Sequence, residues 1–135
     1  MQRRLPITLC VLLTLVVMSA AANAETLVAV SQAYAEPQIL VEIVKQLVEA
    51  HTDLEVDHRR NFQGASLVHA AFQSGDVDFY VSHTGTQFTG VLGMQVTEEW
   101  KDRDKVLAYV QDQFQERFDA TWFAPFGFNN TYALV

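Results

Sequence analysis

The hydrophobic and polar positions of this chain follow two different periods, and their order predicts an α/β fold. Thr26–Val30 is a short, mostly apolar run with β-branched residues, which is typical of a buried strand. Pro37 suits the first turn of a helix, and beyond it apolar residues recur at helical spacing to about His51, with charged residues on the opposite face. The pattern therefore predicts a strand followed by an amphipathic helix.

The same alternation continues along the rest of the chain. We expect further strands at Leu54–His58 and Val77–Val81, helices at Gly64–Gln73, Thr84–Leu92 and Val106–Phe118, and candidate strands at Thr121–Ala124 and Thr131–Val135. The charged stretch between residues 97 and 104 is expected to be a solvated approach to the last helix. Strands that alternate with helices form a parallel sheet, and ligands of such sheets bind beyond the carboxyl ends of the strands. The loops at that edge are residues 31–36, 61–65, 82–86 and 125–130.

The first residues have the features of a targeting signal. Arg3 and Arg4 precede an apolar run, and Ala22-Asn23-Ala24 fits the small-x-small pattern of a cleavage site. This run is too short to span a bilayer, which takes about 20 residues. We therefore expect a signal peptide over residues 1–24, cleavage after Ala24 and a periplasmic mature chain. Cys10 is the only cysteine and lies inside the signal, so the mature chain has no thiol for a disulfide or for thiolate chemistry.

Charge and length restrict the possible partners. The chain has 9 basic and 16 acidic residues, and loss of Arg3 and Arg4 leaves 7 against 16, a net charge of −9. Nucleic-acid binding depends on basic surface, so we expect no nucleic-acid partner. The mature chain has 135 − 24 = 111 residues, enough for one small core.

The sequence contains no catalytic or cofactor motif, so we expect no enzyme, no cofactor and no metal. It lacks a Gly-rich phosphate loop with a lysine and a Gly-x-Ser-x-Gly turn, and its four histidines show no paired metal spacing. We expect His69 to be a satisfied, half-buried histidine of its helix. Asp78 is expected to orient a backbone loop, and Thr84 is expected to cap its helix.

Two segments carry the candidate binding chemistry. Phe126–Leu134 places three aromatic residues and two side-chain amides within nine positions, without Lys or Arg, and Asp78–Thr86 has the same character. Ring faces together with short polar groups suit a site that holds a soft organic cation. The chain stops one residue after the first of these segments, and we expect that only part of the protein is present.

These residues resemble the substrate-binding proteins of osmoprotectant ABC transporters, which carry glycine betaine, choline, carnitine and related quaternary amines. The resemblance rests on Ser31–Leu40, Gly64–Tyr80, Thr84-Gly85-Thr86 and Gly127–Leu134, in this order across the mature chain. It implies an α/β parallel-sheet lobe of a two-lobed (type II) periplasmic binding protein. Residues 25–135 would form an incomplete first lobe, and the second lobe would be mostly missing.

The resemblance also implies a ligand site made by Tyr132, Asn130, Thr86 and His83. Tyr132 would belong to an aromatic cage around the trimethylammonium head, Asn130 would be a polar contact beside it, and Thr86 would line the cleft. Two positions depart from the family pattern. His83 stands where the family usually has Tyr, and Ala35-Glu36-Pro37 stands where it usually has Thr-Glu-Gln. A neutral imidazole can offer a π-face, whereas a protonated one repels a quaternary ammonium.

Each candidate also has a structural interpretation. Tyr132 is expected to be either a cage residue or a packed ring, Asn130 a ligand contact or a turn residue, and His83 a ligand contact or a surface residue. The expected function is the exported binding component of an ABC importer, with a quaternary amine and the membrane permease as partners. Binding would be weak because only one wall of the cleft is present. A diverged lobe acting as an interaction module, and a binding protein for a different small solute, remain alternatives.

Overall fold

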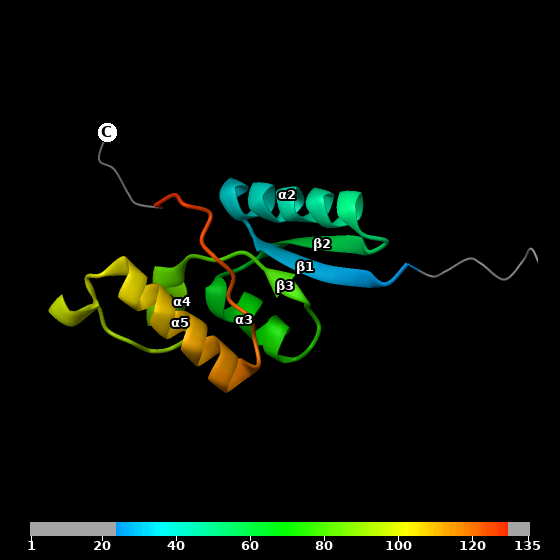
Figure 1. Cartoon of the computed structure of the whole chain (residues 1–135). Helices are drawn as coiled ribbons and strands as arrows, with labels where there is room; N and C mark the ends of the chain where they lie inside the picture. Colours follow the sequence, from blue (N-terminus) through cyan, green and yellow to red (C-terminus); the bar gives the residue numbers. More distant parts are fainter. Residues whose placement is uncertain (1–23, 130–135) are drawn as a thin grey trace, which may run out of the picture.

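A small parallel sheet forms the centre of the fold. The computed structural model of the chain describes residues 24–129. The strand order is β2-β1-β3, so β1 (Thr26–Gln32) lies between β2 (Glu55–Phe62) and β3 (Phe79–Tyr80) (Figure 1). Both pairings are parallel, with Leu27 opposite Val56 and Ala29 opposite Phe79. The parallel α/β sheet predicted from the alternating pattern is therefore confirmed.

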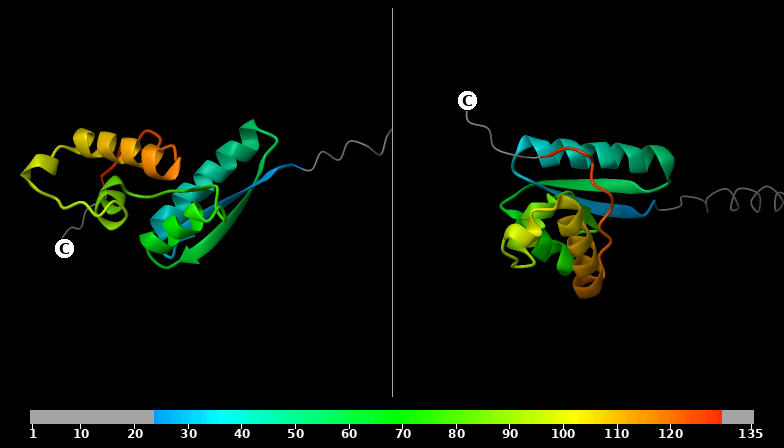
Figure 2. Two further views of the ribbon diagram at one scale, coloured as in Figure 1. Left: turned by 90° about the horizontal axis from the view of Figure 1, so that it is seen from below. Right: turned by 60° about the vertical axis from the view of Figure 1, so that its left-hand side comes forward.

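Helices cover both faces of the sheet. Helix α2 (Ala35–His51) lies on one face, over β1 and β2, and α3 (Ala65–Gln73) lies on the other (Figure 1). Helices α4 (Thr84–Gly90) and α5 (Arg103–Phe118) pack together on the α3 side, with a 3-10 turn, η1 (Glu98–Trp100), between them in sequence (Figure 2). No helix within residues 24–129 is both long and apolar enough to span a membrane.

The alternation of β1 explains why both faces are covered. Ala29 packs with Val41 and Val56 under α2, whereas the next residue, Val30, packs with Val68 and Val77 on the α3 side. Successive strand residues point to opposite faces, so an apolar pair such as Ala29-Val30 requires a layer on each side. This is the arrangement that the continuous apolar run of the strand predicts.

A third core lies between α4 and α5. Phe88 and Phe114 are buried there, and the partly buried rings of Trp100, Tyr109 and Trp122 surround them. Helix α5 begins where the side chain of Asp102 accepts hydrogen bonds from the backbone N–H groups of Asp104 and Lys105. The charged stretch before α5 therefore supplies the helix cap as well as solvated surface.

Several predicted boundaries differ from the observed ones. Strand β2 extends to Phe62, four residues beyond the prediction, and β3 is reduced to Phe79–Tyr80. The predicted strand at Thr121–Ala124 is wrong, because this segment has no regular secondary structure. The carbonyl of Trp122 accepts a hydrogen bond from Nε2 of Gln111 on α5, so this group is satisfied outside any sheet. The predicted strand Thr131–Val135 lies outside the described residues.

Candidate functional site

The carboxyl ends of β1 and β3 bring the candidate site together. Glu36 lies in the first turn of α2, just after β1, and His83 precedes the first residue of α4, just after β3. Oε1 of Glu36 and Nε2 of His83 are 3.0 Å apart, which forms an ion pair when the imidazole is protonated. The contact joins two loops that the sequence places at the same edge of the sheet. The sequence predicts that the two loops are neighbours, but no spacing or motif predicts that these two side chains pair.

Aromatic rings stand beside this pair. The ring of Phe128 lies 6.5 Å from the imidazole of His83 in an edge-to-face arrangement, and Phe126 lies 6.5 Å from Phe128. Both phenylalanines are exposed, at 59% for Phe126 and 51% for Phe128. Tyr34, which is 45% exposed, donates its hydroxyl to Oε1 of Gln32. Exposed rings beside the carboxyl ends of the strands offer π-faces to a cation.

Of the four predicted site residues, His83 and Thr86 lie in the described part of the chain. His83 is partly exposed at the rim, and Thr86 is exposed in the first turn of α4, three residues further on. Asn130 and Tyr132 lie outside the described residues. Gln87, which is fully buried, donates its backbone N–H to the carbonyl of His83 and its Nε2 to Oγ of Ser82, and so helps to hold the start of α4. The predicted capping role of Thr84 is wrong, because His83 occupies the cap position and no side chain caps the helix.

A buried polar network lies under α2, next to the site. His58 contacts Oγ of Ser31 through Nε2 at 2.8 Å and Oε2 of Glu42 through Nδ1 at 3.2 Å. Its side chain is only 3% exposed, and Arg60 donates to the same carboxylate oxygen at 3.1 Å. The hydrogen bond with His58 holds the pKa of Glu42 below its ordinary value, and a hydrogen bond from Gln46 and the charge of Arg60 add to this effect.

This network has the order of a Ser-His-acid triad, but its geometry does not favour catalysis. Ser31 is 1% exposed, so a substrate has no access to its hydroxyl. The arrangement instead fastens α2 to β1 and β2 and so fixes the helix that carries Glu36. Sequence reasoning missed it because residues 31, 42 and 58 come from three elements and show no motif spacing.

Asp78 has the role predicted for it. Its Oδ2 accepts a hydrogen bond from the backbone N–H of Val28 at 2.7 Å, and its own N–H donates to the carbonyl of Val28 at 2.8 Å. These two bonds hold the chain that enters β3 against β1. They matter because β3 pairs with β1 through only two residues. Asp78 thereby supports the strand that leads to His83.

His69 is more deeply buried than the sequence predicts. It is 5% exposed, with the hydroxyl of Tyr80 at 3.0 Å from Nδ1 and the ring of Phe118 at 4.5 Å, and its Nε2 has no hydrogen-bond partner. Burial lowers the pKa of His69 and raises the pKa of Tyr80. Its predicted role as a structural histidine fits this position between α3 and α5, although only one of its two ring nitrogens has a hydrogen-bond partner.

Because His69 is buried, we expect the free energy of unfolding to depend on pH. The folded-state pKa of His69 lies below its ordinary value of 6.5, so the unfolded chain binds the proton more readily. Its contribution is present above about pH 6.5 and is lost as the pH falls toward the lower folded-state pKa. We expect the free energy of unfolding, measured by urea titration, to fall between pH 7.5 and pH 5 more steeply in the wild type than in His69→Phe. Equal falls in the two proteins would contradict the role of this group.

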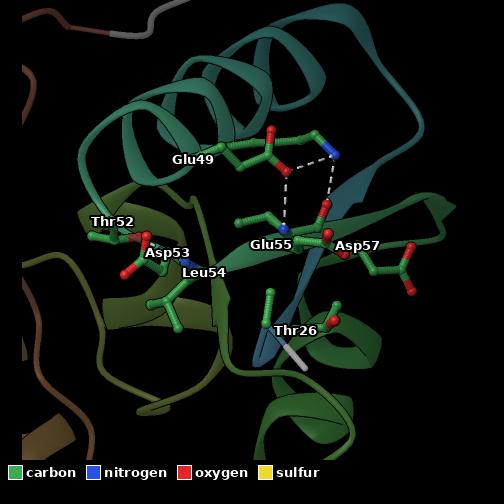
Figure 3. Close-up of a pocket in the computed structure, with 10 residues that line it drawn as sticks. Thr26, Glu49, Thr52, Asp53, Leu54, Glu55 and Asp57 are labelled. Atoms are coloured by element: carbon green, nitrogen blue, oxygen red, sulfur yellow. Dashed lines mark hydrogen bonds and ion pairs between the residues drawn. The ribbon is translucent and has the colours of Figure 1, made fainter. Parts of the chain in front are cut away.

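A pocket at the opposite end of the sheet is a poor match to the candidate chemistry. It is lined near the amino ends of β1 and β2 by Glu49, Asp53, Glu55 and Asp57, together with Lys45 (Figure 3). Lys45 pairs with Glu49 at 3.3 Å and donates to the carbonyl of Val56. This pocket contains no aromatic ring. Within the described ranges, no group of three metal-ligating side chains gathers anywhere.

Comparison with known proteins agrees with this geometry. A family model described as the substrate binding domain of ABC-type glycine betaine transport systems matches residues 25–135. The chain belongs to this family. The carnitine transport binding protein OpuCC of Listeria monocytogenes, including that of serotype 1/2a (strain 10403S), is 41% identical over 106 residues, which cover 78% of this chain and 33% of the relative.

A solved structure of the same kind supports the fold of this substrate-binding domain. A crystal structure titled as a glycine betaine/carnitine/choline ABC transporter matches with a TM-score of 0.74 and 27% identity, over 82% of this chain and 40% of that chain. The fold is therefore that of an α/β parallel-sheet lobe of a periplasmic binding protein, as the sequence predicts. The chain spans about a third of the length of the curated relatives, at 33%.

Proposed function

We propose that this chain is the exported substrate-binding component of an ABC importer for quaternary-amine osmoprotectants. The observation that supports it most directly is the convergence of the Phe128 ring and His83 at the carboxyl ends of the parallel strands, in a chain of the glycine betaine substrate-binding family. Relatives of this chain are named for carnitine, and a related structure for glycine betaine, carnitine and choline. The chemical class of ligand follows from these names and from the aromatic rim.

A quaternary ammonium has no N–H to donate, so hydrogen bonds cannot hold its head group. Ring faces can, and each contributes about 0.5–2 kcal/mol depending on how far the contact is desolvated. We propose that Tyr132 and His83 supply ring faces, that Asn130 is a polar contact, and that Thr86 lines the cleft. The chain acts by binding alone, without catalysis or a cofactor, and delivers its ligand to a membrane permease.

The N-terminal residues complete the proposal. Residues 1–24 are a signal peptide cleaved after Ala24, and residues 25–135 form the first lobe of the binding domain. The mature protein works in the periplasm. Sequencing the N-terminus of the exported protein tests this: a first residue of Glu25 is expected, and retention of the apolar segment would contradict it.

Ligand binding tests the central proposal. We expect the mature chain, followed by NMR, to show signal changes at His83 and Phe128 on titration with choline, with a dissociation constant weaker than micromolar because one cleft wall alone leaves the ligand partly hydrated. Tyr132→Ala is expected to weaken binding about 3- to 30-fold, and Tyr132→Phe to leave it nearly unchanged, because the ring face is retained. The neutral isostere 3,3-dimethyl-1-butanol is the matched control and is expected to bind more weakly.

Two further outcomes bear on these expectations. A micromolar constant for the mature chain, measured by calorimetry, would contradict the expected weak binding and show that one wall is enough. Equal effects of choline and its neutral isostere would contradict the proposal itself, because the site would then not recognise a cation. A thermal-shift screen of quaternary amines against amino acids and organic acids separates the proposal from a binding protein for a different small solute.

One observation favours a second candidate, an interaction module. The outer face of α2 carries Ile39, Ile43 and Leu47 at a spacing of four residues, exposed at 58%, 48% and 54%. This spacing forms an apolar stripe along one side of the helix. A stable dimer at low micromolar concentration, measured by light scattering, would support this candidate, and a monomer would leave the transport function preferred.

A further inference from the structure

The rim of the site carries very few charges. The four loops at the carboxyl ends of the strands, residues 31–36, 61–65, 82–86 and 125–129, contain one carboxylate, Glu36, and one basic side chain, His83. These two residues are the pair whose Oε1 and Nε2 atoms lie 3.0 Å apart. Within the loops themselves, a fixed charge can therefore come only from this pair. The charges that flank the 61–65 loop, Arg60 and Glu42, pair with each other at 3.1 Å.

Glu36 is held in a defined position. It lies in the first turn of α2, where the helix dipole favours a negative charge, and its Oε1 atom is enclosed without a well-aligned hydrogen bond. Among the contacts described for this oxygen, the close polar one is with Nε2 of His83, at 3.0 Å. The two side chains are about equally exposed, at 34% for Glu36 and 29% for His83, so the pair remains open to a ligand.

We propose that Glu36 is the charge-selecting residue of this site, and that the site therefore prefers a net cation such as choline over a zwitterion such as glycine betaine. This inference rests on the proposed function. A fixed carboxylate attracts the ammonium of both ligands, but it repels the carboxylate that only the zwitterion carries. His83 orients the carboxylate and, when protonated, offsets part of its charge. Phe128 and Phe126 supply the uncharged part of the rim.

The size of the effect follows from distance and solvent. A charge a few ångström away in a partly exposed site is screened much less than in bulk water, and it gives a preference of about three- to tenfold. Removing the negative charge without changing the shape, by Glu36→Gln, is expected to bring the ratio of the two dissociation constants to about one. Removing the imidazole by His83→Gln leaves the carboxylate uncompensated, so the preference for choline is expected to stay equal or to increase.

The test is a pair of NMR titrations on the mature exported chain. Choline chloride and glycine betaine are each added to about 100 mM at constant ionic strength. The ring signals of His83 and Phe128 are followed in the wild type and Glu36→Gln, and the ring signals of Phe128 alone in His83→Gln. Glu98→Gln is the matched control, because it removes one carboxylate from a residue that is 86% exposed and lies outside the four loops. We expect this control to retain the wild-type ratio.

Each outcome decides the question. A choline preference that disappears in Glu36→Gln and persists in the control supports the inference. A ratio unchanged by Glu36→Gln, or a wild-type preference for glycine betaine, overturns it while the proposed transport function stands. Failure of both amines to shift any signal overturns both proposals. Should Glu36→Gln not fold, a lower choline preference in His83→Gln than in the wild type overturns the inference, and an equal or higher one supports it.

Discussion

Replacing Phe114 with alanine is expected to lower the free energy of unfolding by about 3–5 kcal/mol. Phe114 is 2% exposed and makes edge contacts with His69, Phe118 and Trp122 at ring distances of 5.4, 5.2 and 5.0 Å. Truncation to alanine removes the whole buried ring and leaves a cavity between α4 and α5. Since small domains are stable by about 5–15 kcal/mol, this loss is a large fraction of the total.

The matched control for Phe114→Ala is the same change at Phe123. That ring is 80% exposed, so Phe123→Ala is expected to change the free energy of unfolding by no more than about 0.5 kcal/mol. Both variants are measured by urea unfolding followed by circular dichroism at neutral pH. Similar losses in the two variants would mean that the core between α4 and α5 does not contribute to the stability of the domain.

Replacing His58 with alanine is expected to cost about 2–4 kcal/mol. The imidazole fills a buried position under α2 and contacts Ser31 at 2.8 Å and Glu42 at 3.2 Å. Its removal leaves the hydroxyl of Ser31, which is 1% exposed, buried without this partner. The loss therefore combines a cavity with an unsatisfied polar group.

A double-mutant cycle with Ser31→Ala tests the origin of this loss. The two changes are expected to be non-additive by about 0.5–3 kcal/mol, because they remove the two ends of one hydrogen bond. His51→Ala is the control, since it makes the same substitution at an exposed position and is expected to have little effect. Strict additivity of Ser31→Ala and His58→Ala would show that the bond contributes nothing.

The sequence predicted the fold well where one pattern determines the structure. The apolar run of β1 and the helical spacing of α2 each have one clear period. Both elements lie within a few residues of the expected bounds. Thr121–Ala124 has the composition of a strand, but its Trp122 ring packs on Phe114 and its backbone stays outside the sheet. Local composition cannot show whether such a segment joins a sheet or only packs its side chains against a helix.

The site was less predictable because its contacts join distant residues. His83 departs from the family pattern, and Glu36 is the residue that matches it within the other departing stretch, Ala35-Glu36-Pro37. Their 3.0 Å contact depends on two strands ending at one edge. The network of Ser31, Glu42 and His58 has no signal in spacing at all, since side chains from three elements form it. Only the packing of α2 on the sheet brings them together.

The two contacts between α2 and Val56 have a consequence for solubility. Strand β2 is an outer strand, and its Val56 N–H donates to Oε1 of Glu49 at 3.0 Å while its carbonyl accepts from Nζ of Lys45 at 2.6 Å. An outer strand with free backbone groups is a template on which another polypeptide can add a strand and start an aggregate. Here two charged side chains from the covering helix occupy those groups, so this border of the molecule is closed to such addition at Val56.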